Sequence, residues 1–257
     1  MGARRLRRGV YLLPTVFTVG NLFCGFVSVA NAAAGQLDRA ALLIIFAGVL
    51  DALDGRIARM TGSTSEFGLQ FDSLADVVSF GVAPAFLAFQ WSPLPRGNLG
   101  FAFVFVACAA LRLARFNIQP TAGSEPKRHF AGLPSPAAAG LVASVVFAFP
   151  GPTQARLIGE GRMALVTIAA LLMVSRFRYR SFKDFDLRSR RPFRWVLAIV
   201  GIVTVVRFWP EGTLLLMASA YALSAPAGWI WTLMVRRKGA GLPPAVSEEV
   251  VDGGATR

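Results

Sequence analysis

Four aspartates lie between two apolar runs, and this arrangement restricts the fold more than any other feature of the sequence. The run before them, residues 40–50, is apolar throughout, and the run after them, residues 77–89, is nearly so. Neither run reaches the roughly 20 residues that a helix needs to cross a bilayer unless the acidic segment is included. Charges inside a span are costly and usually mark a functional site. The four residues are Asp51, Asp54, Asp72 and Asp76.

The polar turn Thr61–Glu66 joins the two predicted spans into an antiparallel hairpin. With a rise of about 1.5 Å per residue, Asp54 and Asp72 face each other at a depth of roughly 9 Å. By the same measure, Asp51 faces Asp76 at roughly 14 Å. Carboxylates so arranged repel one another unless cations lie between them. No His or Cys lies between residues 51 and 76, so the site is all oxygen and suits two divalent ions, Mg²⁺ or Mn²⁺.

Small residues accompany the acids. Gly55, Ala58 and Gly68 leave room for a ligand or a backbone to approach the carboxylates. Arg59 is a suitable partner for a phosphate oxygen. Together these residues describe a site for a substrate that carries a pyrophosphate. The alternative is an ion-pair network, in which Arg56 and Arg59 neutralise two of the acids.

The hairpin contains the pattern Asp-Gly-x2-Ala-Arg-x8-Gly-x3-Asp-x3-Asp from Asp54 to Asp76, with Asp51 three residues before it. This pattern resembles the signature of the CDP-alcohol phosphatidyltransferase family without a departure. The resemblance implies metal-binding aspartates and a general base at Asp76, although on physical grounds any of the four could serve as the base. It also implies a CDP site shaped by Gly55, Ala58, Arg59 and Gly68.

The rest of the chain predicts an all-α, polytopic membrane protein. Its residues are 54% hydrophobic, and the mean hydropathy is +0.54, which a soluble domain with so many long apolar runs would not show. We expect about eight spans. They are Val10–Ala34, Ala40–Met60, Phe67–Phe89, Leu99–Phe116, Leu133–Phe149, Met163–Phe177, Phe193–Trp209 and Thr213–Val235.

The basic residues predict how these spans are oriented. The net charge is +13, and most Lys and Arg residues fall on the side of the membrane that also holds both termini. Those at the opposite ends are Arg39, Arg96, Arg156, Arg162 and Arg207. The asymmetry predicts cytoplasmic termini, a cytoplasmic opening of the acidic hairpin and an inner-membrane location. Nucleic-acid binding explains the charge poorly, because the basic residues lie in short loops between spans.

Further predictions concern the start of the chain, its cysteines and its division into parts. A basic start at Arg4–Arg8 before an apolar run resembles a signal peptide, but the run is too long and is interrupted by polar residues, so we expect no cleavage. Cys24 and Cys108 lie within spans and are expected to be packing residues rather than a disulfide. The predicted parts are a basic N-terminus (1–9), a catalytic core (10–150), further spans with a basic loop (151–238) and a disordered tail (239–257).

The first predicted span carries Thr18 and Asn21 on one face. Polar groups in a span usually face protein, so these two residues either bond a neighbouring helix or contact a ligand. The family resemblance favours the second reading, because a Thr and an Asn at this place commonly line the cytidine pocket.

The fourth predicted span ends in Arg-Leu-Ala-Arg-Phe-Asn, from Arg112 to Asn117, and a later loop reads Gly-Leu-Pro-Ser-Pro-Ala-Ala-Ala-Gly around Ser135. These segments, with Lys127-Arg128 between them, resemble the phosphatidylserine synthase branch of the family. The resemblance covers residues 14–140. Arg112 and Arg115 could instead be arginines that reach the membrane surface. His129 is expected to be a loop residue.

The branch implies transfer of a phosphatidyl group from CDP-diacylglycerol to L-serine, with release of CMP, and it implies a homodimer. Serine carries a carboxylate that needs a cation. The candidates for binding serine are Arg112, Arg115, Asn117, Lys127, Arg128 and Ser135. The alternatives are another acceptor (glycerol 3-phosphate, inositol phosphate or choline) and, from another class, a divalent-cation transporter.

Overall fold

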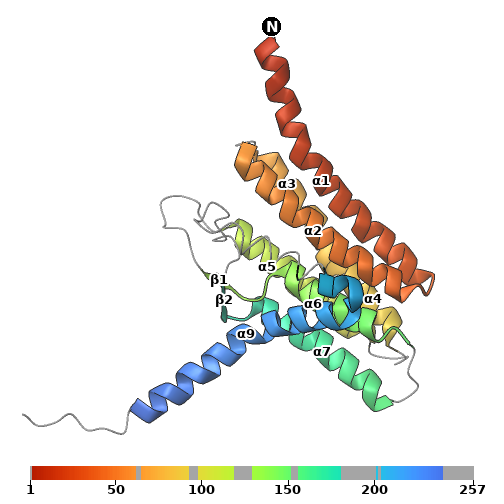
Figure 1. Cartoon of the computed structure of the whole chain (residues 1–257), viewed down its shortest axis with the longest axis vertical. Helices are drawn as coiled ribbons and strands as arrows, with labels where there is room; N and C mark the ends of the chain where they lie inside the picture. The colour runs from red at the N-terminus through yellow and green to blue at the C-terminus, as the bar shows by residue number, and fades with distance from the viewer. Residues whose placement is uncertain are drawn as a thin grey trace, which may run out of the picture.

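Helices make up nearly all of the secondary structure in this computed structural model (Figure 1). It describes residues 2–61, 65–92, 98–118, 129–151, 156–180, 201 and 204–239. The first half holds α1 (Gly2–Ala33), α2 (Leu37–Thr61), α3 (Glu66–Asp76), η1 (Val77–Val82), α4 (Ala83–Trp91) and α5 (Asn98–Asn117). The second half holds β1 (His129–Ala131), α6 (Ser135–Ala148), α7 (Arg156–Val174), β2 (Arg178–Arg180) and α9 (Pro210–Gly239).

Four stretches among the described residues are long and apolar enough to cross a membrane: Thr15–Ala33, Glu66–Trp91, Asn98–Asn117 and Leu157–Val174. They correspond to the first, third, fourth and sixth predicted spans, so the prediction of a helical membrane protein is confirmed at this level. Large apolar side chains such as Phe23 and Phe103 are 64% and 68% exposed. Side chains of this kind on the outside of a bundle suit contact with lipid rather than water.

The other predicted spans differ from these four. Helix α2 has 25 residues, but Asp51 and Asp54 interrupt its apolar sequence. Helix α6 is apolar and has only 14 residues. Helix α7 begins at Arg156, earlier than predicted for the sixth span, and ends at Val174 because the chain then enters a strand. The seventh predicted span, Phe193–Trp209, lies largely outside the described residues.

The prediction of an all-α fold misses one feature, a pair of short strands. Strands β1 and β2 are antiparallel, with Phe130 opposite Tyr179, because the chain leaving α7 runs back along the chain that enters α6. Tyr179 is fully buried, and its hydroxyl donates to the carbonyl of Ala222 in α9 at 2.9 Å. Burial, together with nearby Tyr221, raises the pKa of Tyr179 to about 12, so the hydroxyl keeps its proton and this bond. The strand pair therefore attaches α9 to the bundle.

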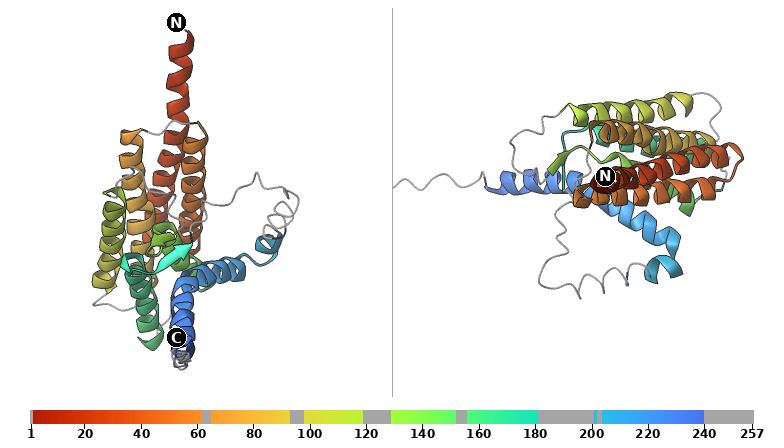
Figure 2. Two further views of the ribbon diagram at one scale, coloured as in Figure 1. Left: turned by 90° about the vertical axis from the view of Figure 1, so that its left-hand side faces the viewer. Right: turned by 90° about the horizontal axis from the view of Figure 1, so that it is seen from above.

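Helices α1 and α2 form a tight hairpin (Figure 2), and the third span packs along α1 through α3, η1 and α4 and on α2 through η1 and α4. The hairpin turns at Gly35, whose φ of +77° is left-handed and whose amide donates to the carbonyl of Ala32 at 3.0 Å. The third span consists of α3, η1 and α4 without a break. Its middle piece, η1, is a π-helix that begins directly after Asp76.

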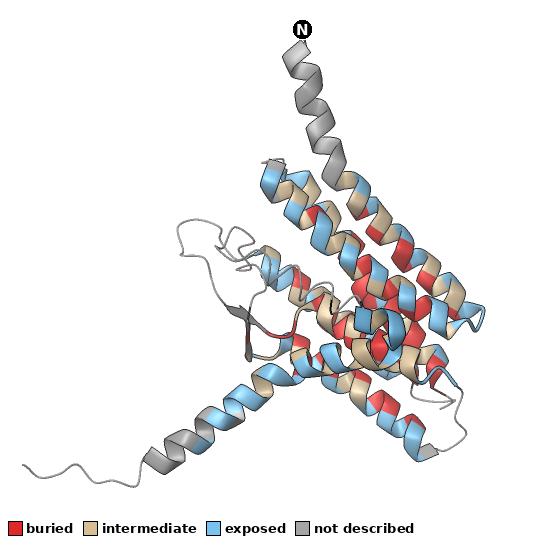
Figure 3. Cartoon of the chain, in the orientation of Figure 1, coloured by how far each residue is buried: buried red, intermediate tan, exposed pale blue. Residues whose placement is uncertain are grey.

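The buried apolar residues come mainly from α2, α4, α5, α6 and α7, and they form one core inside the bundle (Figure 3). Phe80 of η1, Leu87 of α4 and Phe105 of α5 have no exposed surface. Small residues, mostly alanines, fill much of the rest of this core. They allow close approach of helix backbones, which is how helices associate in a membrane.

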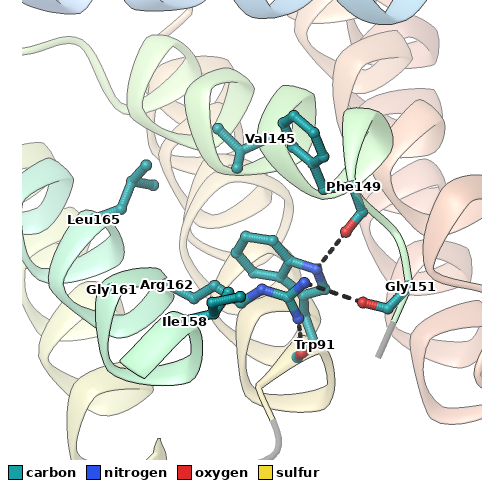
Figure 4. Close-up of a pocket in the computed structure, with 8 residues that line it drawn as sticks. All are labelled: Trp91, Val145, Phe149, Gly151, Ile158, Gly161, Arg162 and Leu165. Carbon is teal, nitrogen blue, oxygen red and sulfur yellow. Dashed lines mark hydrogen bonds between the residues drawn. The ribbon is translucent and has the colours of Figure 1, made fainter. Parts of the chain in front are cut away.

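A buried arginine joins three helices at the end of α4. Arg162 of α7 donates to the carbonyl of Trp91 at 2.9 Å and to that of Gly151 at 3.0 Å (Figure 4). Its guanidinium carbon lies 4.1 Å from the centre of the Trp91 ring. Trp91 in turn donates to the carbonyl of Phe149 at 2.7 Å. We call this group the arginine clamp; a hollow of about 590 Å³, lined mainly by apolar side chains, lies beside it.

Candidate active site

Three of the four aspartates meet at one point between α2 and α3. Asp51 of α2 and Asp72 and Asp76 of α3 each offer a carboxylate oxygen, and these oxygens lie within 4.8 Å of one another. We call these three residues the carboxylate cluster. The i,i+4 spacing puts Asp72 and Asp76 on one face of α3, toward α2. Because like charges at such distances repel strongly in a weakly polar surrounding, the arrangement favours a bound cation.

Asp54 lies beside the cluster rather than in it. It is 4% exposed, and its Oδ2 accepts a hydrogen bond of 2.8 Å from the hydroxyl of Thr18 in α1. Its charge still acts on Asp72 and on Asp76. The four carboxylates therefore form one electrostatic unit, as the matched depths in the sequence predict, although Asp54 also has a partner on α1.

The cluster fits a divalent metal ion. All of its donor atoms are carboxylate oxygens, the ligands that hard cations prefer. The Oδ1 atom of Asp72 is buried and has no hydrogen-bond partner among the described residues. A buried carboxylate oxygen without a protein partner is costly unless a cation or a ligand meets it.

The structure places Thr18 and Asn21 on the face of α1 that meets the carboxylates. Asn21 is fully buried, and its Nδ2 donates to Oδ1 of Asp76 at 3.2 Å. Each of the two polar residues thus bonds one carboxylate on a different helix. This is the helix-bonding alternative of the sequence analysis; their contact with a nucleotide stays a prediction.

Arg112 of α5 lies near enough to the cluster to interact electrostatically with it. It donates to the hydroxyl of Ser135, at the start of α6, at 2.9 Å. The charges of Asp76 and Asp51 both act on it. Its Nε is buried and has no hydrogen-bond partner in the described part of the chain. The structure therefore provides a partly buried cation near the carboxylates, with a buried Nε that has no hydrogen-bond partner among the described residues.

The remaining candidates for binding serine are placed differently. Arg115 is exposed, although it lies one turn from Arg112. The Asn117 amide donates to the hydroxyl of Ser73 at 2.9 Å and so ties the end of α5 to α3 beside Asp72. Lys127 and Arg128 lie outside the described residues.

The candidates for the CDP site all lie on the hairpin. Gly55 and Ala58 are partly exposed on α2, in the half that carries Asp51 and Asp54. The amide of Gly68 donates to the hydroxyl of Ser65, which caps α3, at 3.0 Å. Arg59 belongs to α2, but its side chain lies outside the described part of the structure.

Sequence reasoning missed Ser73 and Ser79. Ser79 has no exposed surface, and its hydroxyl donates to the backbone carbonyl of Asn21 at 2.9 Å. A serine in an apolar run is a weak signal, because its hydroxyl commonly bonds its own helix. The signal that could have found Ser79 is Gly25 on α1, because a glycine in a span indicates that another helix approaches closely there.

Fold and site together define a helical membrane protein with an all-oxygen acidic cluster that suits divalent cations and a partly buried arginine near it. Comparison with known proteins makes this specific. The family model for CDP-alcohol phosphatidyltransferase matches residues 11–175, and the chain belongs to that family. The match includes every helix that contributes to the site described above.

Relatives from distant organisms extend the likeness. The chain is 37% identical over 235 residues to CDP-diacylglycerol–serine O-phosphatidyltransferase of Helicobacter pylori strain J99, covering 88% of this chain and 94% of the relative. It is 31% identical to the Bacillus subtilis protein of the same name, covering 71% of this chain and 98% of that one. A protein of that name from Methanocaldococcus jannaschii is 39% identical over 62% of this chain and 73% of its own length.

Proposed function

We propose that this chain is a membrane-embedded CDP-diacylglycerol–serine O-phosphatidyltransferase of phospholipid biosynthesis. The observation that carries the proposal is the carboxylate cluster, with Arg112 close enough to interact with its charges, in a helical bundle of this family. Relatives that cover most of this chain bear the same name. The cluster suits a pyrophosphate neutralised by cations, and the arginine suits the carboxylate of an amino acid.

The reaction is a substitution at phosphorus. The serine hydroxyl forms a bond to the phosphorus that carries diacylglycerol, the bond from that phosphorus to the bridging oxygen breaks, and CMP leaves with the electron pair. The hydroxyl proton passes to a carboxylate, which we assign to Asp76. The products are phosphatidylserine and CMP, so atoms and charge balance without a further reactant.

The metal proposal is two ions of Mg²⁺ or Mn²⁺, held by Asp51, Asp54, Asp72 and Asp76. Such ions neutralise charge on the pyrophosphate and on its leaving oxygen when they are bound. The support is the all-oxygen donor set and the unpaired Oδ1 of Asp72. The chain's own part is to hold the acids close together, while Gly55, Ala58, Arg59 and Gly68 shape the CDP site.

For the acceptor, we assign the serine carboxylate to Arg112. Nη1 of the guanidinium donates to Ser135, and the buried Nε remains available to bind the ligand. A guanidinium binds a carboxylate with two parallel hydrogen bonds, which matches the chemistry of serine but not that of choline. Arg115, Asn117, Lys127 and Arg128 remain candidates for the rest of the serine site.

The proposed setting is the inner membrane, with about eight spans, a homodimer, both termini in the cytoplasm and the active site open to that side. The charge asymmetry of the sequence supports this orientation. Residues 10–150 would form the catalytic core and 151–238 the additional spans. A cysteine placed in Thr61–Glu66 should react with a membrane-impermeant thiol reagent from the cytoplasmic side, and one at Gly151 from the outside. The reverse pattern would overturn the orientation.

The experiment that tests the activity uses the purified full chain with CDP-diacylglycerol and labelled L-serine. We expect labelled phosphatidylserine and CMP in equal amounts. Glycerol 3-phosphate, inositol phosphate and choline should neither give lipid products nor compete with serine. If another acceptor is used while serine is not, the family assignment stands and the acceptor is wrong.

A further inference from the structure

One face of α1 carries small and polar residues at the spacing of a buried helix face. Thr18, Asn21, Gly25 and Ser28 follow at i, i+3, i+7 and i+10, and all four are buried. The neighbouring residues Phe23 and Phe26 are exposed. This face therefore meets protein, and the residues on it set how closely α1 approaches α2 and the third span.

Asn21 on this face holds Asp76 through its side chain. One N–H of the amide donates from Nδ2 to Oδ1 of Asp76 at 3.2 Å, and this bond restricts the orientation of both side chains. The amide oxygen Oδ1 of Asn21 is buried without a hydrogen-bond partner among the described residues. Leaving a buried amide oxygen without a partner is unfavourable. The hydrogen bond to Asp76 therefore has to offset that cost.

Ser79 and Gly25 fix Asn21 in turn. The Ser79 hydroxyl donates to the Asn21 carbonyl at 2.9 Å. A Cβ on Gly25 would lie 2.5 Å from Oγ of Ser79 and 2.8 Å from its Cα. Only a glycine lets α1 and this backbone come so close.

Ser79 lies in η1, the π-helix Val77–Val82 that begins directly after Asp76. A π-helix inserted in an α-helix changes the angular relation of residues on its two sides, and such insertions are frequent at functional sites. Here the wider turn of η1 lets residues on its two sides make different contacts. Residue 76 faces the carboxylates, while Ser79 three residues later reaches the backbone of α1.

We propose that Asn21 is a positioning residue for Asp76, and that the contact of Gly25 and Ser79 between α1 and η1 sets this geometry. The inference rests on the proposed function, in which Asp76 takes the proton of serine. The bond from Nδ2 of Asn21 to Oδ1 of Asp76 limits the rotation of the carboxylate that takes this proton. Asn21 thus acts on the turnover step rather than on the binding of the nucleotide.

The first test compares Asn21→Ala, Ser79→Ala and the double variant in the full-length enzyme. A positioned base contributes roughly 10²–10⁴-fold to a rate. We expect Asn21→Ala to remove part of this contribution and to lower kcat by about tenfold to a hundredfold. The KM for CDP-diacylglycerol and the KM for serine should change less than about threefold. Ser79→Ala should lower kcat by a smaller factor.

The double variant separates positioning from a general structural effect. Ser79 reaches Asp76 through residue 21, so adding Ser79→Ala to Asn21→Ala should lower kcat no further. Equal losses in both backgrounds would show that Ser79 acts independently, and would overturn the proposed relay. An Asn21→Ala enzyme with unchanged kcat and a raised KM for CDP-diacylglycerol would make Asn21 a nucleotide contact and would also overturn it.

The second test needs no turnover. A Cβ at Gly25 meets the Ser79 backbone, whereas a Cβ at Gly48 of α2 meets the ring of Phe80, also in η1, at an ordinary 3.9 Å. Both changes to Ala improve helix propensity alike, so Gly48→Ala is the matched control. In metal-free protein, Gly25→Ala should speed amide hydrogen exchange in Val77–Val82, and Gly48→Ala should not. Equal exchange in both variants would overturn the role of Gly25.

Failure of the proposed function would look different. If the wild-type chain makes no phosphatidylserine, the reaction is wrong, but the exchange experiment still reports whether Gly25 sets the packing of η1. If the wild type is active and Asn21→Ala is equally active, the reaction stands and the positioning role falls.

Discussion

The carboxylate cluster and the arginine clamp are both buried charges inside membrane helices, and they are satisfied in opposite ways. Arg162 is 9% exposed, and its guanidinium meets two backbone carbonyls and an aromatic face. Asp76 is similarly buried at 8%, but carboxylate oxygens of Asp51 and Asp72 lie within 4.8 Å of its own. The protein completes the surroundings of the arginine, whereas Oδ1 of Asp72 is buried without a hydrogen-bond partner among the described residues. We therefore assign the arginine to stability and the acids to ligand binding.

One helix connects the two regions. Asp76 and Trp91 belong to the same continuous stretch Glu66–Trp91, and 15 residues at a helical rise put them roughly 20 Å apart along the axis. The carbonyl of Trp91 ends α4, so Arg162 also meets the negative end of a helix. The clamp anchors the far end of the helix that carries two carboxylates.

The largest expected effect is that of removing metal. Oδ1 of Asp72 is buried without a hydrogen-bond partner among the described residues, and in the proposed function bound cations compensate the carboxylates, so excess chelator should abolish transfer of serine to lipid. Added Mg²⁺ or Mn²⁺ should restore it. The arginine clamp needs no ion, so the circular-dichroism spectrum should keep its helical signal during chelation. Full turnover in excess chelator would contradict the metal proposal.

The next effect is that of a single carboxylate. Asp72→Asn keeps the shape but removes a charged ligand, and we expect kcat to fall on the order of a thousandfold, as for other preorganised electrostatic groups. The melting temperature of metal-free protein should hold or rise, since like-charge repulsion is relieved. Glu66→Gln, at the exposed start of the same helix, is the control and should change neither. Near-normal turnover by Asp72→Asn would show that this carboxylate is not essential.

A smaller effect is expected at Arg112. Arg112→Lys keeps the charge but loses the bidentate hydrogen bonding to a carboxylate. Loss of one charged hydrogen bond costs about 1.5–3 kcal/mol, so the KM for serine should rise about tenfold to a hundredfold while that for CDP-diacylglycerol changes little. Arg115→Lys, on an exposed side chain, should raise it less. If the KM for serine stays unchanged in both variants, Lys127 and Arg128 become the residues to test.

The sequence predicts the acids and the helices better than it predicts their partners. Four carboxylates in apolar runs and the spacing of the hairpin are local patterns, and the structure brings Asp51, Asp72 and Asp76 together. Which neighbour each acid meets depends on which face α1 turns toward the hairpin of α2 and α3. That orientation is set by packing between helices and is not a local pattern in the sequence.

The same limit explains two other differences. The charge rule places Arg162 at an outward polar end, but the structure buries it, because the carbonyl of Trp91 at the end of α4 and that of Gly151 after α6 lie within its reach. The π-helix after Asp76 has no composition of its own, since Val77–Val82 reads as an ordinary apolar run. Both features arise from contacts between segments far apart in the chain.

The smallest effect on activity, and the one that tests the comparison most directly, is expected at the arginine clamp. Arg162→Gln removes the charge and the contact with the Trp91 ring, and it cannot reach both carbonyls. Each charged hydrogen bond is worth about 1.5–3 kcal/mol, so the melting temperature should fall by several degrees. The kcat of the folded enzyme and the KM for serine should stay within about twofold. Arg39→Gln, on an exposed arginine at the start of α2, is the control for loss of a positive charge and should leave the melting temperature unchanged.

An unchanged melting temperature for Arg162→Gln would remove the stabilising role of the clamp. Loss of kcat without loss of stability would show instead that the helix Glu66–Trp91 transmits the state of the clamp to Asp76, and the two regions would then be one functional unit.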